Sequence, residues 1–600
     1  MSNGKNIVIL GAGYGGVKAA KLLNRKLKDS NISITLIDKH PYHTLMTELH
    51  EVAGARTDKE AVQISLKKIF SATRVNVVID QIESIDFQKQ ELKSGNSKYS
   101  YDYLVLGTGA EPAFFGIPGV KEAGFTLWSL EDAIKLREHI EQMFKLAARE
   151  KDAAKRKEML SFVVAGAGFT GIETAGELVE WKRRLSREYD IPEAEVRLMV
   201  VEAMGSILPI LDEGLIKRSE RYLQRKKVDV ITNAPITEVK EESITLKDGR
   251  QIPTRTLIWT CGIQGSSFAA GLGLTMGKRG RIQINEYMQS MDYGNVYVVG
   301  DNAYFEEDSK PIPQIVEAAL QTAGTAVYNI IADMEQKPKK AFKSNYHGIM
   351  VSIGSRYAVA NLMNRSMSGF VAMAIKHVVN IHYQFEVAGV MQVIAYCMHE
   401  FVDIRDNRSF IGGHLANRTP ILWLAILRVY LGVIWLIEGI NKVKEGWLVP
   451  GSNFIVALPK ASDVPLTDAD AVSNATQVTQ SYPTPLISKP PAIYQWFTDN
   501  IISPHAYLFQ VSVVLMEIAI GLALIAGLFT ILAALGSLFL CGNFIISAMA
   551  GSEIFWHIFA GIAMFGGAGR AFGLDYYVMP WLKDWWKRTR LARRTYLYVD

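Results

Sequence analysis

Two glycine-rich turns of one pattern, about one domain apart, constrain this chain more than any other feature. The first turn, residues 11–16 (GAGYGG), follows the apolar run 6–10, and the second, residues 166–171 (GAGFTG), follows the apolar run 161–165. In a strand–turn–helix unit the first glycine permits a tight turn, the second lets a pyrophosphate approach, and the third lets helix and strand pack closely. The glycines concerned are Gly11, Gly13, Gly16, Gly166, Gly168 and Gly171. Since the helix that follows presents its positive end to phosphates, the chain is predicted to bind two dinucleotides.

Each turn is followed by a second apolar strand that ends in an acidic residue. The strand 34–38 ends in Asp38, with Lys39 beside it, and the strand 197–202 ends in Glu202. A carboxylate in this place accepts hydrogen bonds from a ribose 2′-hydroxyl and repels a 2′-phosphate. We therefore expect Asp38 and Lys39 at the first cofactor and a preference for NADH over NADPH at the second. Two dinucleotides on one chain imply electron transfer between them.

Length, charge and cysteine content bound the remaining possibilities. A chain of 600 residues should form three or four folding units, and its net charge of +5 gives little reason to expect nucleic-acid binding. The three cysteines are too far apart in sequence for a metal cluster or a disulfide framework, and the histidines at positions 40, 43 and 50 lack metal spacing. Residues 1–5 run straight into the first strand, so we expect no signal peptide and a cytoplasmic nucleotide-binding half.

Residues 1–345 alternate apolar strands with amphipathic helices, which indicates an α/β fold. Two further strand ends carry useful residues. The buried strand that begins at Tyr101 runs into the turn Thr108–Gly109, and the strand 295–299 ends in Gly300 and Asp301.

The order of these four features resembles the two-dinucleotide-binding-domain (Rossmann-like) flavoproteins. The resemblance implies that the first turn holds FAD and the second NADH, and that Asp301 hydrogen-bonds the ribityl chain of the flavin. It also implies an inserted second domain. The FAD-binding domain would then comprise residues 1–115 and 281–345, and the NADH-binding domain residues 116–280.

Three further stretches resemble the type II NADH dehydrogenases, the single-subunit NADH:quinone oxidoreductases. They are residues 168–173 (GFTGIE), 259–263 (WTCGI, with Gly262 near the nicotinamide) and 347–355. The similarity covers roughly residues 5–400. It implies a non-pumping bacterial respiratory enzyme that oxidises cytosolic NADH through FAD and reduces a membrane quinone of the menaquinone or ubiquinone type by two electrons. It also places Glu173 between nicotinamide and quinone, where it could relay a proton; the alternative is a helix-start carboxylate that complements the helix dipole.

The chain departs from this family at a helix start beside the flavin, where the quinone head group is thought to dock. The family's Ala-Gln-x-Ala-x-Gln run is Val-Glu-Ala-Ala-Leu-Gln at residues 316–321, so Gln321 is retained and Glu317 replaces the first glutamine. A carboxylate is a different hydrogen-bonding partner for a quinone carbonyl unless it is protonated. We assign Glu173, Glu317 and Gln321 as catalytic candidates; the alternative for Glu317 is a solvated charge.

Dithiol chemistry at this face of the flavin is excluded by the same comparison. Residues 42–51, where disulfide reductases of this fold place a cysteine pair, contain no cysteine. The lone Cys261 cannot supply the pair that sulfide:quinone oxidoreductases need, and a packing role is expected for it.

Residues 346–417 are expected to dock on the membrane. Within 368–400, apolar runs are interrupted by Lys376, His377, Asn380 and His382, which favours an interfacial amphipathic segment over a span. The alternative is a helical pair that packs a homodimer.

Residues 418–600 are expected to form an all-α transmembrane domain. Its four apolar stretches, each near the ~20 residues that cross a bilayer, are Pro420–Asn441, Ala506–Phe529, Ile531–Ala550 and Ile554–Phe572. The arrangement, with Leu427–Gly432 and Glu438–Gly439, is faintly similar to the DoxX-like four-helix family. Loop 442–504 would lie outside, and the basic tail, from Lys583 to Arg594, in the cytoplasm.

Charged residues inside the spans are costly and are usually paired. The candidates are Arg428, Glu438, Glu517, Glu553 and His557, with Arg428 as the expected partner of Glu517. The pair would serve a quinone or proton site, or fix helix register. Trp581, Trp585 and Trp586 are interpreted as an interfacial belt.

Two other functions fit the same sequence. The NADH-oxidising head could deliver electrons through the extra membrane domain to a dedicated quinone pool or an extracellular acceptor. The chain could instead be a membrane-bound redox sensor that responds to NADH, with a slowly reacting flavin.

Overall fold

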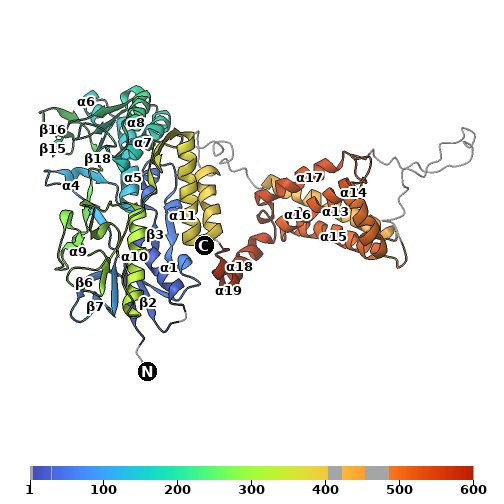
Figure 1. Cartoon of the computed structure of the whole chain (residues 1–600). Coiled ribbons are helices and arrows are strands. Elements are labelled where there is room, and N and C mark those ends of the chain that lie inside the picture. The colour runs from blue at the N-terminus through green and yellow to red at the C-terminus, as the bar shows by residue number, and fades with distance from the viewer. Residues whose placement is uncertain (1–3, 29, 403–421, 453–484, 599–600) are drawn as a thin grey trace, which may run out of the picture. The chain divides into compact units, whose positions relative to one another are not determined.

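The computed structural model describes residues 4–28, 30–402, 422–452 and 485–598. It divides into two compact units, shown in Figure 1. The head unit comprises residues 1–417 and 590–600, and the helical unit comprises residues 418–589. Each unit is described by itself.

The first glycine turn lies on a five-stranded parallel sheet at the centre of the head unit. The strand order is β21 (Val296–Val298), β9 (Tyr103–Leu106), β1 (Asn6–Leu10), β2 (Ser33–Asp38) and β5 (Val75–Ile79). The strands are rich in buried Ile, Val and Leu, as expected where helices cover both faces of a parallel sheet. Helices α1 (Tyr14–Lys26) and α10 (Val316–Met334) pack against each other on it.

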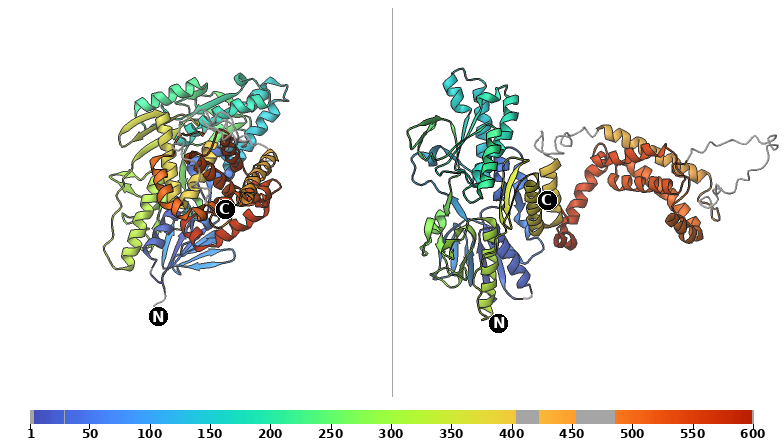
Figure 2. Two further views of the ribbon diagram at one scale, coloured as in Figure 1. Left: turned by 90° about the vertical axis from the view of Figure 1, so that its right-hand side faces the viewer. Right: turned by 45° about the horizontal axis from the view of Figure 1, so that its top comes forward.

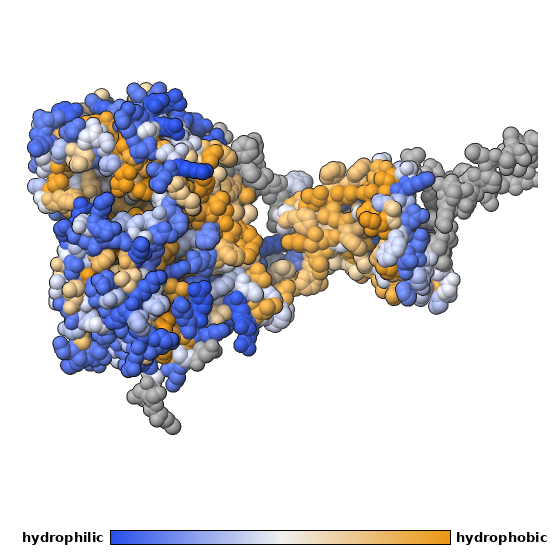
Figure 3. Space-filling view, viewed as in Figure 1, coloured by the Kyte–Doolittle hydropathy of each residue, from blue (hydrophilic) through white to orange (hydrophobic). Residues whose placement is uncertain are grey.

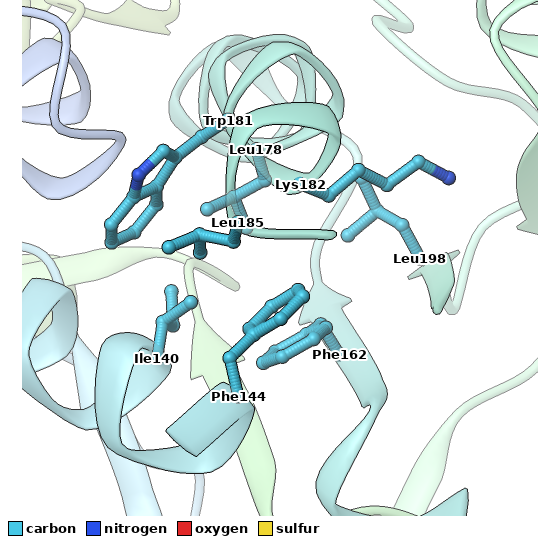
Figure 4. Close-up of a pocket in the computed structure, with 8 residues that line it drawn as sticks. All are labelled: Ile140, Phe144, Phe162, Leu178, Trp181, Lys182, Leu185 and Leu198. Atoms are coloured by element: carbon cyan, nitrogen blue, oxygen red, sulfur yellow. The ribbon is translucent and has the colours of Figure 1, made fainter. Parts of the chain in front are cut away.

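The second glycine turn lies on another five-stranded parallel sheet. Four of its strands are arranged as in the first sheet, but its edge strand, β11 (Gly124–Thr126), precedes the others in sequence, whereas β21 follows them. Its strands are β11, β18 (Thr256–Trp259), β12 (Ser161–Ala165), β13 (Arg197–Val201) and β14 (Val228–Ile231). Helices α5 (Leu130–Ala147) and α7 (Phe169–Glu188) cover it. Figure 4 shows the apolar recess beneath α7, where Trp181 and Leu185 face Ile140 and Phe144 of α5.

The chain completes the first sheet only after it has built the second. β21 pairs with β9 in the first sheet, although β11, β12, β13, β14 and β18 all lie between them in sequence. Between the two modules, β10 (Ala110–Pro112) pairs with β19 (Ile263–Gly265). The division at residues 115 and 280 stays a prediction.

Short elements complete the two modules. The helices are α2 (Leu49–Ala53), α3 (Leu66–Ile69), α4 (Val120–Ala123), α6 (Ala153–Met159), α8 (Glu213–Arg225) and α9 (Ser267–Ala270). Paired strands are β3 (Tyr42–Thr44) with β4 (Gln63–Ser65), β20 (Ile282–Gln283) with β22 (Ala303–Tyr304), and β23 (Glu306–Glu307) with β24 (Lys310–Pro311). Two three-stranded sheets are β6 (Ile82–Asp86), β7 (Glu91–Ser94) and β8 (Lys98–Ser100), and β15 (Ile236–Val239), β16 (Ser243–Leu246) and β17 (Gln251–Pro253).

The expected docking region begins with a sheet and continues as a long helix. Strands β25 (Gly348–Ser352), β26 (Ala358–Leu362) and β27 (Arg365–Gly369) form an antiparallel sheet, and α11 (Phe370–Cys397) follows. The helical path of α11 breaks at Ala388 and Gly389, and a π-helical turn covers 398–402. Residues 403–417 of this region lie outside the described residues.

The polar residues of α11 have a different structural role from the predicted one. Lys376 is buried and pairs with two glutamates of the head unit. His377 and Asn380 both contact the hydroxyl of Tyr396, and His382 is exposed. These residues interrupt the apolar runs largely because they line the interior of the head, so they are not evidence for a polar face toward headgroups. The exposed face of α11 is nevertheless apolar, including Phe370, Val378 and Phe385.

The end of the chain returns to the head unit. Helix α19 (Arg590–Thr595) belongs to it, and the hydroxyl of Tyr596 donates to the carbonyl of Ile69 at 3.0 Å. The ammonium of Lys21 lies 5.6 Å from the centre of the Tyr596 ring.

The described part of the helical unit contains four long apolar helices, three of them shorter than the predicted stretches. They are α13 (Leu422–Lys444), α15 (Ala506–Ala526), α16 (Thr530–Ile546) and α17 (Ile554–Ala563). Short helical turns, with α14 (Ala492–Phe497), precede α15, and α18 (Asp575–Arg588) follows α17. Among the described residues, only Leu422–Lys444 and the continuous stretch Ala492–Ala526 are long and apolar enough to cross a membrane. Much of the predicted external loop, 453–484, lies outside the described residues.

Glycines explain where the helical path after α17 ends and how two other helices meet. The fourth apolar stretch leaves the α-helix at Ala563, because Gly567 adopts φ +89. Between α13 and α15, a Cβ added to Gly432 or Gly521 would lie 2.9 Å from the carbonyl oxygen of the other. Such close backbone approach is typical of membrane helix pairs. Figure 3 shows apolar residues over most of this unit's surface, with hydrophilic residues at one end, and Figure 2 shows its helices from two further sides.

The predicted pairing of Arg428 with Glu517 is wrong. Glu517 is paired with Lys442, whose ammonium donates to both carboxylate oxygens at 2.8 and 2.9 Å. Arg428 instead donates to backbone carbonyls at residues 568, 571 and 572. The two cations of α13 are fourteen residues apart, about 21 Å along the helix axis. One carboxylate on α15 therefore cannot serve both.

Candidate active site

Both glycine turns have the same backbone geometry. Gly11 adopts φ +102 and Gly166 φ +92, a region that favours glycine. A Cβ atom on Gly16 would overlap the carbonyl oxygen of Gly11, and one on Gly171 would overlap that of Gly166. The first and third glycines of each turn are therefore required by the backbone itself.

The middle glycine of each turn faces open space. A Cβ added to Gly13 or Gly168 would meet nothing within 4 Å. Each of these residues precedes a helix, α1 or α7, whose first N–H groups donate no hydrogen bond to a capping side chain. Uncapped N–H groups at the positive end of a helix favour an anion. We call each glycine turn, together with the start of the helix that follows it, a cradle. The two cradles therefore fit the phosphates of two dinucleotides.

The acidic residue of each module is tied to its glycine turn. Asp38 Oδ2 accepts from the backbone N–H of Ala12, and Glu202 Oε2 from that of Ala167, both at 2.6 Å. The other oxygen of each carboxylate accepts from the N–H two residues further on, at 2.8 Å. Lys39 has an exposed side chain at the end of β2. The geometry brings both carboxylates to the cradles, and their contacts with ribose stay predictions.

The ends of β9 and β21 lie beside the first cradle and are joined there by hydrogen bonds. Asn302 Nδ2 donates to Thr108 Oγ1 at 2.9 Å, and the N–H of Gly300 donates to Thr322 Oγ1 at 3.1 Å. Gly109 and Gly300 adopt φ +70 and +71. The two strand ends and α10 are thereby fixed to one another.

Asp301 has a raised pKa at this place, and one atom of Asn302 lacks the partner that a buried polar group needs. Burial raises the pKa of Asp301 to about 6, although the positive charge of Arg281 opposes the shift. The Oδ1 atom of Asn302 is buried and has no hydrogen-bond partner within the described ranges. Buried polar atoms without partners indicate an unfilled site, so these residues fit the sugar-like chain of a flavin dinucleotide.

Glu173 lies at the second cradle, on the first turns of α7. Its Oε1 accepts from the N–H and the hydroxyl of Ser352, at 3.3 and 3.2 Å, and its Oε2 lies 3.9 Å from Nδ1 of His50. Burial raises the pKa of Glu173 to about 7, with Lys376 opposing the shift. Burial likewise lowers the pKa of His50 to about 3, so this imidazole is neutral. A carboxyl group that titrates near pH 7 can take up and release a proton.

Behind Glu173 lies a buried network of charges. Arg56 pairs with Glu51, Glu177 and Glu400, and Lys376 pairs with Glu48 at 3.2 Å and Glu51 at 3.0 Å. Carboxyl groups outnumber cations in this cluster. Accordingly, burial raises the pKa of Glu400 to about 8 and that of Glu48 well above its usual range. Arg56 and Lys376 overcome burial at Glu51 and hold its pKa low. The network therefore places carboxyl groups with raised pKa values close to Glu173.

Glu317 and Gln321 lie one turn apart on α10 and both hold the segment before β25. Glu317 accepts from the backbone N–H of His347 at 3.1 Å and contacts its Nδ1. The amide of Gln321 donates to the carbonyl of Asn345 at 2.8 Å and accepts from its N–H at 2.9 Å. Both candidate side chains therefore form hydrogen bonds to other residues of the chain, Asn345 and His347.

The remaining candidates lie between the two modules. Gly262 adopts φ +138, and its carbonyl accepts from the N–H of Ala113 at 3.0 Å. The indole of Trp259 donates to the carbonyl of Ala113 at 2.8 Å. Burial raises the pKa of the Cys261 thiol to about 12, so this cysteine stays protonated and packs beside the second sheet.

Sequence reasoning missed several residues of the site. His43 joins the first turn to α11, since Nδ1 lies 2.9 Å from the carbonyl oxygen of Ala12 and Nε2 lies 2.8 Å from the Tyr383 hydroxyl. Ser352 and Lys376 reach Glu173 from far along the chain. No local signal identifies them, because only the fold brings these elements together.

The family model for pyridine nucleotide-disulphide oxidoreductases matches residues 5–323. The chain belongs to this family. Its three cysteines, Cys261, Cys397 and Cys541, are free, so this member has no internal disulfide to reduce.

Proteins similar to this family member come from several organisms. It is 28% identical over 391 residues to a type II NADH:quinone oxidoreductase of Staphylococcus saprophyticus, covering 64% of this chain and 96% of that protein. It is 29% identical over 393 residues to that of Staphylococcus aureus, with the same coverage. Among solved structures, NDH2 from Plasmodium falciparum in complex with NADH matches with a TM-score of 0.60 at 16% identity, over 66% of this chain and 98% of that one. The latter likeness concerns the fold of the head.

Proposed function

We propose that this family member is a membrane-bound, non-pumping NADH:quinone oxidoreductase. The single observation that carries the proposal is the pair of matched cradles on two parallel sheets of one head unit. A family that uses pyridine nucleotides and similarity over nearly the whole length of type II relatives agree with it. FAD and NADH are its two dinucleotides.

The residues of the head divide the work of binding. The turn 11–16, Asp38, Lys39, Thr108, Gly109, Gly300 and Asp301 would hold FAD, and the turn 166–171, Glu202 and Gly262 would hold NADH. When bound, the flavin accepts a hydride from NADH and supplies two electrons to the acceptor. The protein orients the two dinucleotides and keeps water from them. Glu173 would hold or move a proton beside the nicotinamide.

The membrane attachment follows from how the chain enters and leaves the helical unit. Residues on both sides of that unit, up to 417 and from 590, belong to the head unit. If the head stays on one face of the membrane, the helical unit crosses an even number of times. We assign the crossings to α13, α15, α16 and α17, of which α16 is about 26 Å long. This DoxX-like arrangement with four spans is part of the proposal.

The orientation rests on positive charge. The end of α18 and α19 together carry Lys583, Lys587, Arg588, Arg590, Arg593 and Arg594. Positively charged residues next to membrane helices stay in the cytoplasm. Because α19 packs within the head unit, the head would lie in the cytoplasm with it. The exposed aromatic residues Trp581 and Trp585 and the apolar face of α11 would rest in the interface. No feature of the described residues calls for a homodimer or selects a quinone type.

A visible absorption spectrum of the purified protein tests the proposal. We expect a yellow protein that bleaches on anaerobic addition of NADH and recovers its colour when a benzoquinone or naphthoquinone is added. A protein that stays colourless after incubation with FAD would refute it. Bleaching without recovery on any quinone would favour a dedicated acceptor or a sensor, and a sensor would also show no steady-state turnover.

A further inference from the structure

A carboxylate and an imidazole form a pair on the flavin module that the proposed binding roles do not explain. Glu317 lies in the first turn of α10, and it holds His347 by both the backbone N–H and Nδ1 of the ring. Gln321, one turn later, clamps Asn345 through both groups of its amide. The segment 345–347 is therefore fixed at two points, and the imidazole has one orientation.

The second ring nitrogen of His347 is open. Within the described part of the chain, Nε2 has no hydrogen-bond partner, and 59% of the side chain is exposed. A carboxylate that engages Nδ1 sets the tautomer and stabilises the protonated ring. The free Nε2–H of such an imidazolium is suited to donate a proton to a group that arrives from outside.

The pair lies beside the first cradle. Ala319, two residues after Glu317, approaches both the glycine turn and the end of β21. An added Cβ would lie 3.5 Å from the carbonyl oxygen of Ala319 at Gly15 and 3.4 Å from its Cβ at Gly300. The first turn of α10 therefore packs against the backbone that surrounds the first dinucleotide.

Strand β25 separates this pair from Glu173. His347 precedes the strand and Ser352, the partner of Glu173, ends it, so these two partner residues are about 16 Å apart along the strand. Glu173 belongs to the module that receives NADH, and Glu317 belongs to the module from which electrons leave. A proton donor that is fixed on the flavin module is therefore well placed for the electron acceptor.

Other charged groups face the pair from neighbouring elements. Tyr346 lies close to the charges of Glu317, Glu307 and Arg281, and its hydroxyl is buried without a hydrogen-bond partner within the described residues. Glu307 accepts from the N–H of Ser344 at 3.0 Å. These groups set the electrostatic environment in which His347 titrates.

We propose that His347, oriented by Glu317, donates the proton that quinone reduction takes from solution. The inference rests on the proposed function. NADH supplies two electrons and one proton as a hydride, and the quinone takes up two electrons and two protons, so one proton comes from outside. The imidazolium gives its Nε2 proton to a quinone oxygen, and the neutral ring is reprotonated by solvent. His347 is thus a catalytic residue and Glu317 a positioning residue.

Rapid mixing of the full-length holoenzyme separates the two half-reactions. In the wild type, reoxidation of the reduced flavin by a water-soluble quinone should slow as the pH rises through the titration of His347. In His347→Gln it should be 10- to 100-fold slower at low pH and independent of pH in this range, with unchanged reduction by NADH. Glu317→Gln should slow reoxidation by a smaller factor, because the ring loses the carboxylate that orients it. His505→Gln, at an exposed histidine of the helical unit, is the control.

Two further measurements cover a variant that folds poorly. Added imidazole should restore part of the reoxidation rate of His347→Ala, since the site is open to solvent. In NMR spectra of histidine-labelled enzyme, the signal of one imidazole should change in Glu317→Gln, because its Nδ1 loses the carboxylate contact. A wild-type rate and pH profile in His347→Gln would overturn the inference and leave the proposed function intact. A wild type that no quinone reoxidises would overturn both.

Discussion

The two dinucleotide-binding modules are close copies at their glycine turns and differ in what surrounds them. Four strands of each sheet are arranged in the same way, and both acidic residues hold the turn through the same backbone bond. Two residues after the third glycine, however, the first module carries Lys18 and the second Glu173. Lys18 is a surface residue paired with Glu386 of α11. Glu173 is buried beside His50 and Ser352.

This difference shows that the repeated motif provides binding, and that the environment provides chemistry. The turn fixes where phosphates bind because backbone geometry alone decides it. The same helix position then becomes a solvated ion pair in one module and a group that titrates near pH 7 in the other. Four experiments test how far the likeness and the difference extend, beginning with the largest expected effect.

The third glycine should be necessary in both modules. Its replacement should cost flavin binding in the first module and NADH binding in the second. Since an added Cβ would overlap a backbone carbonyl that cannot move away, Gly16→Ala should yield protein without flavin. Gly171→Ala should retain flavin and lose at least about 100-fold in NADH affinity, which is about 2.7 kcal/mol.

Flavin absorbance and NADH titration of the purified variants check this expectation. Gly324→Ala is the matched control, since a Cβ on this glycine of α10 meets nothing within 4 Å. Full flavin content in Gly16→Ala would show that the backbone account of the first turn is wrong.

The residues after the two turns should differ sharply in their effect on turnover. Glu173→Gln keeps the shape of the side chain and removes its proton, so kcat with quinone should fall about 100-fold. Lys18→Met removes only an exposed ion pair and should change kcat less than about twofold, because such pairs contribute little. Steady-state kinetics with NADH decides between them. Equal, small effects would remove Glu173 from the chemistry.

The acidic residues should differ in nucleotide selectivity. Glu202→Ser combined with Met204→Arg replaces a carboxylate that repels a 2′-phosphate with a cation that binds it. We expect the ratio of kcat/KM for NADPH to that for NADH to rise about 10-fold or more, roughly 1.4 kcal/mol. Asp38→Ser should leave this ratio unchanged, since it lies in the other module. An unchanged ratio in the double variant would count against Glu202.

The smallest effect concerns stability. Burial raises the pKa of Glu173 from 4.5 to about 7, so its protonated form is favoured in the folded head. Its contribution is present in full below pH 4.5 and is lost as the pH rises to about 7. One carboxyl changes the slope by at most about 1.4 kcal/mol per pH unit. Glu173→Gln should therefore show a shallower decline in unfolding free energy between pH 4.5 and 7, measured by urea denaturation. Parallel profiles for both proteins would contradict the assigned shift.

Much of the head could be predicted from short sequence patterns. The NADH:quinone oxidoreductase function, the two cofactors and the Rossmann-like fold of the head are confirmed. The glycines at positions 16 and 171 could be found because a backbone overlap forbids every other residue there. By contrast, the partner of Glu517 was predicted wrongly, because hydropathy places a residue in a span and says nothing about which helix face or depth it occupies.

The sequence by itself determined where two dinucleotides bind, since steric exclusion at a glycine and the alternation of strand and helix are local properties. Only the tertiary structure decided that Glu173 lies beside a buried network of charges, that Lys376 points into the head, and that Glu317 holds His347. These facts depend on charge and burial. Both are set by elements that lie hundreds of residues apart in the chain and meet only when the whole head has folded.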